Sequence, residues 1–155
     1  MIWIEPEAKQ KTSLDVLTNR HPTSTATHSE VIQMGEYMQI RGLLKEGEEY
    51  AGLILGKDEP DYHLVLLPGE AADVSWPSAA DWAAARQGAL PTRRELALLF
   101  ANARDGFERN WYWSSEPHAT RAQLVWGQNF ASGIQTIYGR PYRGHARAVR
   151  RIDSV

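Results

Sequence analysis

The sequence predicts an α+β domain in which two helices pack on antiparallel strands. Two strand-like runs, 50–56 and 62–67, are joined by five turn-type residues, which is the pattern of a β-hairpin. Two helical segments with apolar faces follow at 75–87 and 92–103. Residues 111–152 then return to short alternating runs separated by turns. A hairpin, two helices and a meander in this order are typical of the α+β class.

The composition is that of an ordinary globular chain. Its 155 residues suffice for one domain with an appended arm, and hydrophobic residues make up 43%. Cysteine is absent, which excludes disulfides, thiol catalysis and thiolate metal sites. No apolar run is long enough to span a bilayer, and no signal peptide opens the chain. We therefore expect no membrane association and a location in the cytoplasm or in a phage particle.

The net charge of -2 divides unevenly along the chain. Residues 1–85 hold six Lys and Arg against fourteen Asp and Glu, a balance of -8, and residues 86–155 hold eleven Arg against five acids, a balance of +6. Such asymmetry is typical of a surface for an anionic partner, or of two parts of one fold that attract each other. We favour the second interpretation.

Residues 1–45 are predicted to form an N-terminal arm that is partly disordered or serves oligomerisation. Met1–Ile4 has the pattern of a short strand, but 18–30 is rich in Thr, Ser and His and cannot bury enough apolar surface to fold alone. We expect order to begin at Val31–Gly35. The remaining residues, 46–155, form the predicted folded domain, and the arm is the expected route to a homo-oligomer.

The connection of the predicted hairpin carries several acids. Asp58, Glu59 and Asp61 do not follow the spacing of a calcium loop, which needs oxygen ligands at alternate positions and a central glycine. We therefore expect a solvated hairpin tip.

Both helices have recognisable starts. Ser75 is a plausible N-cap residue for the first, followed by a flat alanine-rich face. The second begins with a capping box, in which the Thr92 hydroxyl accepts from the Glu95 N–H and the Glu95 carboxylate reaches back. Leu96 and Leu99 then lie on one apolar face.

The C-terminal part is predicted to be strands. In the aromatic strand 111–115, Trp111 and Trp113 must face one way and Tyr112 the other. Strands at 122–130 and 134–138 follow. A final strand is predicted over His145–Ile152.

Four short motifs follow one another in the predicted domain. Leu90–Glu95 reads LPTRRE, Trp113–Glu116 reads WSSE, Trp126–Phe130 reads WGQNF and Arg147–Arg151 reads RAVRR. In this order they resemble the DUF1566 (Lcl C-terminal-like) domains of bacteria and prophages, over roughly residues 48–152. The resemblance implies a C-type-lectin-like fold that displays side chains for binding.

The chain departs from the relatives of that family that have known chemistry. Formylglycine-generating enzymes need active-site cysteines, and this chain has none. The calcium motif of sugar-binding C-type lectins is not followed either, because Glu116-Pro117 precedes His118. The resemblance therefore implies neither that catalysis nor calcium or sugar specificity.

No motif for catalysis or a cofactor is present. The five histidines lack zinc-site spacing, no Gly-x-Ser-x-Gly elbow occurs, and phosphate-binding loops are absent. We expect no enzyme activity, no cofactor and no metal.

We expect a non-catalytic module of bacterial or prophage origin that binds a protein or glycan. The proposed site is the exposed face of the C-terminal strands, where amide and amphipathic side chains suited to adaptable recognition gather. The candidate contact residues are Gln123, Gln128, Asn129, Gln135, Tyr138, Tyr142 and Arg143.

Two alternatives stay open. Five arginines between 140 and 151, with tyrosines interleaved, suit nucleic acid through phosphate pairing and base stacking. We favour instead that Arg147 and Arg150 pair with acids of the hairpin half. The other alternative is a phage-encoded inhibitor of a host protein complex, which would use the same surfaces.

Overall fold

The computed structural model describes residues 26–154, and the chain divides into two units, Met1–Gly35 and Glu36–Val155. The strand predicted at Met1–Ile4 lies outside the described residues.

The predicted arm contains an unpredicted helix, α1 (His28–Gly42). It begins at a reciprocal capping box, where the Thr27 N–H donates to Glu30 Oε2 at 2.6 Å and the Glu30 N–H donates to Thr27 Oγ1 at 3.3 Å. Order therefore begins before residue 31, as a helix.

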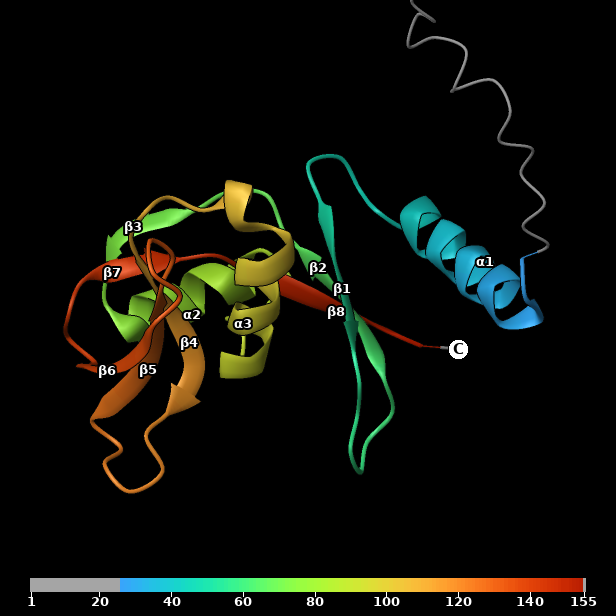
Figure 1. The fold of residues 1–155 in the computed structure, drawn as a ribbon. Helices are drawn as coiled ribbons and strands as arrows, with labels where there is room; N and C mark the ends of the chain where they lie inside the picture. Colours follow the sequence, from blue (N-terminus) through green and yellow to red (C-terminus); the bar gives the residue numbers. More distant parts are fainter. Residues whose placement is uncertain (1–25, 155) are drawn as a thin grey trace, which may run out of the picture. The chain divides into compact units, whose positions relative to one another are not determined.

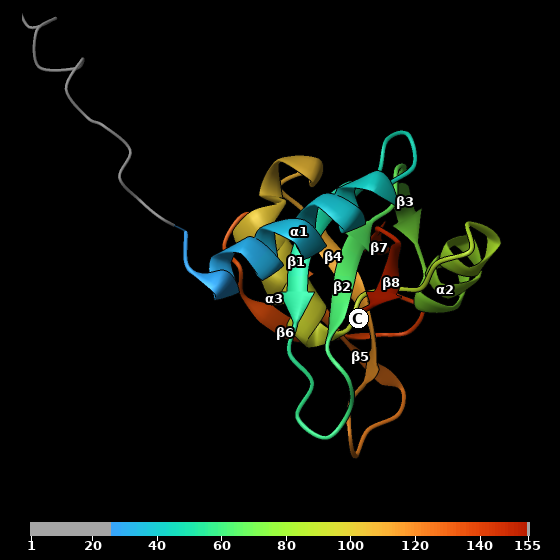
Figure 2. The same cartoon turned by 90° about the vertical axis from the view of Figure 1, so that its right-hand side faces the viewer.

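The first sheet has three strands in the order β1-β2-β8, all antiparallel (Figure 2). β1 (Glu49–Ile54) and β2 (Tyr62–Leu66) confirm the predicted hairpin. β8 (Val149–Asp153) is the last strand in sequence order and pairs with β2 over its whole length.

The second sheet has five strands in the order β3-β7-β4-β5-β6. The predicted meander is confirmed as β4 (Trp111–Pro117), β5 (Leu124–Asn129) and β6 (Gln135–Gly139). β7 (Gly144–Ala146) pairs with β4 in parallel, and β3 (Ala71–Val74), which was not predicted, pairs with β7 at the other edge.

The single final strand predicted over His145–Ile152 is wrong, because β7 and β8 belong to different sheets. Between them the chain passes from one sheet to the other. The Ala148 carbonyl accepts from the Leu67 N–H at 2.9 Å, and Ala89 and Val149 exchange two backbone hydrogen bonds. The segment 146–149 thus joins the two sheets.

Helix α3 (Arg93–Asn102) lies between the two sheets (Figure 1). The capping box of Thr92 and Glu95 is present with both of its hydrogen bonds, as predicted. A short 3-10 turn, η1 (Arg104–Gly106), follows the helix. Helix α2 (Trp76–Ala85) begins after Ser75, whose side chain makes no capping bond.

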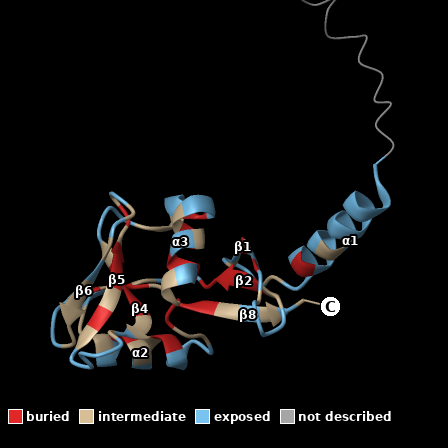
Figure 3. Cartoon of the chain, turned by 60° about the horizontal axis from the view of Figure 1, so that its bottom comes forward, coloured by how far each residue is buried: buried red, intermediate tan, exposed pale blue. Residues whose placement is uncertain are grey.

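Each face of the five-stranded sheet packs on its own helix. Figure 3 shows buried residues in β2 and β5 and at intervals along α3. Tyr112 is fully buried against Leu96 and Leu99 of α3. Trp113 is fully buried in a second cluster with Ala79 and Ala83 of α2. The predicted alternation of β4 is therefore confirmed, and the fold is mixed α+β.

Candidate binding site

The structure distributes the predicted contact residues over two faces of the five-stranded sheet. Gln128 pairs with Gln135, and Val125 pairs with Tyr138 in the neighbouring register. Because neighbouring positions of a strand point to opposite faces, the two glutamines lie on the α3 side and Tyr138 on the α2 side. Gln128 is only 1% exposed, so it supports the site from below rather than offering a surface contact.

Three other predicted residues contribute to neither of these two faces. Gln123 is exposed before β5, and the Asn129 side chain accepts from the Ala131 N–H at 2.7 Å. Arg143 forms an exposed ion pair with Asp73 at 3.7 Å.

On the α3 side, β6 and the first turn of α3 enclose an open hollow of about 430 Å³. Arg93 lines this hollow, and its guanidinium lies over the Trp126 ring with Cζ 3.6 Å from the ring centroid, a cation–π contact. The Arg93 Nε donates to Gln135 Oε1 at 2.9 Å. Within the described part of the chain, no residue accepts from Nη1 or Nη2 of Arg93.

Glutamine side chains form the floor of this hollow. Gln135 Nε2 donates to Gln128 Oε1 at 2.8 Å and to the Arg93 carbonyl at 2.7 Å. Gln128 Nε2 donates in turn to the Leu96 carbonyl at 3.3 Å. The Glu116 carboxylate closes one end by accepting from the Arg93 N–H at 2.5 Å. These contacts fix Arg93 in one orientation.

The outer edge of β6 borders the hollow. β6 ends the five-stranded sheet and pairs only with β5 among the described strands. The Asn129 N–H donates to the Ile134 carbonyl at 2.9 Å, and the Arg140 N–H donates to the Gln123 carbonyl at 3.0 Å. In an antiparallel pair, successive residues alternate between bonding the partner strand and pointing away from it. These two bonds therefore determine which residues of β6 bond β5 and which point away from it.

The backbone N–H and C=O groups of Thr136 and Tyr138 therefore face β5, and those of Gln135 and Ile137 face outward. No residue in the described range 26–154 bonds the outward N–H or C=O groups of Gln135 and Ile137. The strand reads QTIYG, without the charges or proline that commonly protect an edge. The edge of β6 is thus open to a further strand.

On the α2 side, three aromatic rings lie together beside the same edge. The Trp111 and Tyr138 rings are stacked with centroids 3.9 Å apart. Tyr142 lies 5.8 Å from Tyr138 and 6.1 Å from Trp111, and it is 61% exposed. We call Trp111, Tyr138 and Tyr142 the aromatic shelf.

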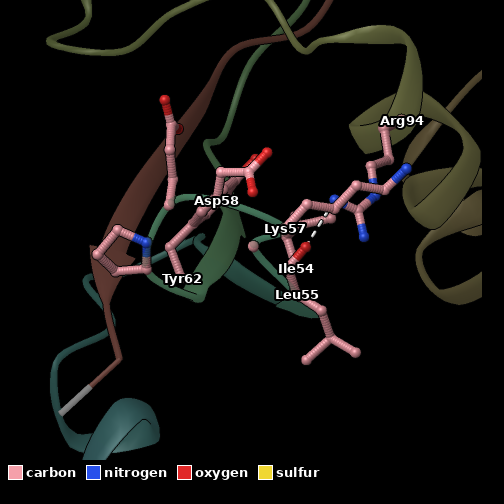
Figure 4. Close-up of a pocket in the computed structure, with 9 residues that line it drawn as sticks. Ile54, Leu55, Lys57, Asp58, Tyr62 and Arg94 are labelled. Carbon is pink, nitrogen blue, oxygen red and sulfur yellow. Dashed lines mark hydrogen bonds between the residues drawn. The ribbon is translucent and has the colours of Figure 1, made fainter.

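A different pocket, of about 340 Å³, lies at the hairpin tip (Figure 4). Arg94 reaches into it from α3 and donates to the Leu55 carbonyl at 2.7 Å. The remaining wall consists mainly of the loop 57–60. Because the one arginine there is already bonded to the main chain, we regard this pocket as structural.

Glu70, Glu108 and His145 could hold a metal ion, since one ligand atom of each lies within 4.8 Å of the others. Glu70 Oε1, however, accepts from the Tyr112 hydroxyl at 2.6 Å and lies 2.6 Å from His145 Nδ1. Burial and the bond to Glu70 raise the pKa of Tyr112, so its hydroxyl keeps the proton it donates. Arg147, which interacts electrostatically with Glu70, adds positive charge there. We interpret the group as a hydrogen-bond network.

The C-terminal arginines are largely engaged within the chain. Arg150 pairs with Glu48 at 2.7 Å, in agreement with the prediction that it binds an acid of the hairpin half. Arg151 pairs with Glu95 at 2.7 Å. Arg147 donates to the Leu67 carbonyl at 2.9 Å and to the Gly106 carbonyl, so its bonds go to carbonyls instead of the predicted acid. These contacts leave fewer cations for phosphate than the sequence suggested.

The sequence predicts the glutamines of the hollow as contact residues but places Arg93 only in the first turn of a helix. The available signal was Trp126, an aromatic on the same strand face as Gln128. Nothing local distinguishes Arg93 from Arg94, because the stacking partner is distant in sequence.

No family model matches the chain, and no curated protein matches it. The resemblance to DUF1566 domains therefore stays a prediction. Among the described residues, no helix has the length and apolar character needed to cross a membrane.

Proposed function

We propose that the chain is a non-catalytic protein-binding module that captures an extended segment of a partner along the outer edge of β6. Such β-strand addition supplies main-chain hydrogen bonds for affinity and alternate side-chain sites for specificity. The observation that carries the proposal is the pair of outward-facing residues Gln135 and Ile137, whose backbone groups are without a partner in the described part of the chain.

The surroundings of the edge support this function. An added strand would place its side chains alternately over the Arg93 hollow and over the aromatic shelf. We further propose that the domain is of the DUF1566 type with a C-type-lectin-like fold, of bacterial or prophage origin. Inhibition of a host complex would be one use of the same edge.

The first experiment selects a displayed library of random linear peptides against the full chain. The selected peptides are then measured on two variants, Ile137→Pro and Ile137→Ala. Both remove the isoleucine side chain, but only proline removes the outward N–H. We expect Ile137→Ala to retain most binding and Ile137→Pro to lose it. Peptides that bind Ile137→Pro as tightly as the unaltered chain, or a library without enrichment, would rule out this edge.

Amide hydrogen exchange tests the same proposal in the unaltered protein. The N–H groups of Gln135 and Ile137 should exchange fast in the free chain and become protected when a selected peptide binds. The Thr136 N–H, which faces β5, should be protected in both states and is the internal control.

A further inference from the structure

We propose that Arg93 binds the carboxylate of an aspartate or glutamate side chain in the partner segment. The inference rests on the proposed strand addition at β6. It assigns a chemical class to the hollow beside that edge, which strand addition alone leaves open.

The first argument is that Arg93 is already held in a binding geometry. Trp126 supports the flat face of the guanidinium, and Gln135 holds Nε. A guanidinium fixed in this way offers its two outer nitrogens as a fork, which matches the two oxygens of a carboxylate. Little conformational freedom is left to lose on binding, which favours affinity.

The second argument is charge. Residues 86–155 carry a balance of +6, and Arg93 is followed by Arg94 in the first turn of α3. Glu116 compensates the main-chain N–H of Arg93, at the helix N-terminus, and not the outer nitrogens of its side chain. Arg93, Arg94 and Glu116 all line the hollow, so its two arginines outweigh its one carboxylate and an incoming carboxylate meets a net positive charge.

The third argument is register. A partner residue paired with Gln135 projects its side chain to the α3 side, beside Arg93. A partner residue paired with Tyr138 projects to the other side, onto the aromatic shelf. Because positions 135 and 138 are three apart, the segment should carry an acidic and an apolar residue three positions apart. The apolar residue comes first if the added strand is antiparallel to β6, and second if it is parallel.

The selected peptides test this inference directly. Each is synthesised with an amidated C-terminus, so that a terminal carboxylate cannot replace the side chain, and its affinity is measured by fluorescence anisotropy. Changing the acidic residue of the peptide to its amide should weaken binding to the unaltered chain at least about tenfold. The same peptide change should have no effect on the Arg93→Gln variant.

Arg104→Gln is the matched control, because Arg104 also lies over an aromatic ring, with Cζ 4.6 Å from the centroid of Phe100, and donates to a carbonyl. It should bind both peptides as the unaltered chain does. Peptides that need the Ile137 N–H but carry no acidic residue, or tolerate its amide, would overturn the role of Arg93 and leave strand addition standing. Peptides that bind Ile137→Pro normally would overturn strand addition itself. The amide peptide needs no protein variant, so a poorly folded Arg93→Gln would not obscure the result.

Discussion

The outer edges of β1 and β6 differ in whether their outward backbone groups are bonded. At the outer edge of β1, Asn102 Nδ2 donates to the Ala51 carbonyl at 2.7 Å and Arg94 Nη1 donates to the Leu55 carbonyl at 2.7 Å. The register of β1 also shifts between residues 50 and 52, and such bulges discourage further pairing. Among residues 26–154, no side chain bonds the outer edge of β6, and its pairing with β5 has no shift in register. One edge is protected and the other is left available.

The same helix accounts for both edges. Arg93 and Arg94 are neighbours, so their side chains leave α3 about 100° apart around its axis. Arg94 therefore reaches the three-stranded sheet and donates to a carbonyl there. Arg93 instead reaches β5 and β6, and its outer nitrogens have no acceptor among the residues that the structure describes. The position of α3 between the sheets thus determines which of the two edges its side chains cover.

The largest expected effect comes from releasing α3. Glu95 is fully buried and accepts from Arg151 at 2.7 and 2.9 Å and from the Tyr62 hydroxyl at 2.7 Å. Glu95→Ala leaves these donors unpaired and should lower the free energy of unfolding by about 3 kcal/mol. The bonds from Arg94 and Asn102 of α3 to the β1 edge, which we call the caps of that edge, should weaken with the helix.

Denaturant unfolding measures this loss, and Glu46→Ala, a change at an exposed glutamate, is the control with an expected effect within about 0.5 kcal/mol. A cost below about 1 kcal/mol for Glu95→Ala would mean that α3 is held mainly by its apolar face.

Acid should produce a smaller form of the same effect. Burial opposes ionisation of Glu95, but hydrogen bonds from Arg151, Tyr62 and the Thr92 N–H outweigh it and lower its pKa below the usual 4.5. The bond from Arg150 likewise lowers the pKa of Glu48. A lowered folded-state pKa contributes stability that is present above about pH 4.5 and is lost as pH falls through the folded-state values.

The denaturation midpoint measured from pH 6 downward should therefore begin to fall near about pH 4.5. Glu95→Gln should flatten the decline, because the substituted group does not titrate. A decline as steep in Glu95→Gln as in the unaltered chain would assign the acid sensitivity to other groups.

Local signals in the sequence predicted much of the fold. The Thr92 capping box, the hairpin and the alternation of β4 all depend on residues close in sequence, and each is confirmed. The same capping pattern at Thr27–Glu30 was missed, because Val31 and Ile32 are adjacent and cannot continue one helical stripe. A helix is recognised in the sequence only when the capping box is followed by a continuous apolar face.

Long-range features were harder to predict. The passage from β7 to β8 changes sheets without any local breaker between Arg147 and Ala148, so the run reads as one strand. For the site, the glutamines were identified by residue type, but the role of Arg93 depends on Trp126, which is distant in sequence. Which edge of a sheet is covered is likewise set by packing, and a single strand does not encode it.

The smallest expected effect on stability comes from removing the caps of the β1 edge. Asn102→Ala together with Arg94→Ala removes one hydrogen bond each from the Ala51 and Leu55 carbonyls. Both side chains belong to exposed residues, so water can replace them, and alanine is the better helix former. The combined loss in unfolding free energy should be about 1 kcal/mol.

The more informative readout of this double variant is association. If the caps are what protects β1, the variant should self-associate with rising concentration in sedimentation velocity, because its edge then resembles that of β6. Arg104→Ala, which also removes an arginine bonded to a carbonyl but away from this edge, should leave the sedimentation profile unchanged. If the double variant sediments like the unaltered chain, the bulge between Tyr50 and Gly52, and not the two side chains, is what protects the β1 edge. The contrast between the edges would then come from strand geometry, and β6 would differ from β1 because its pairing with β5 runs without a shift in register from Gln135 to Gly139.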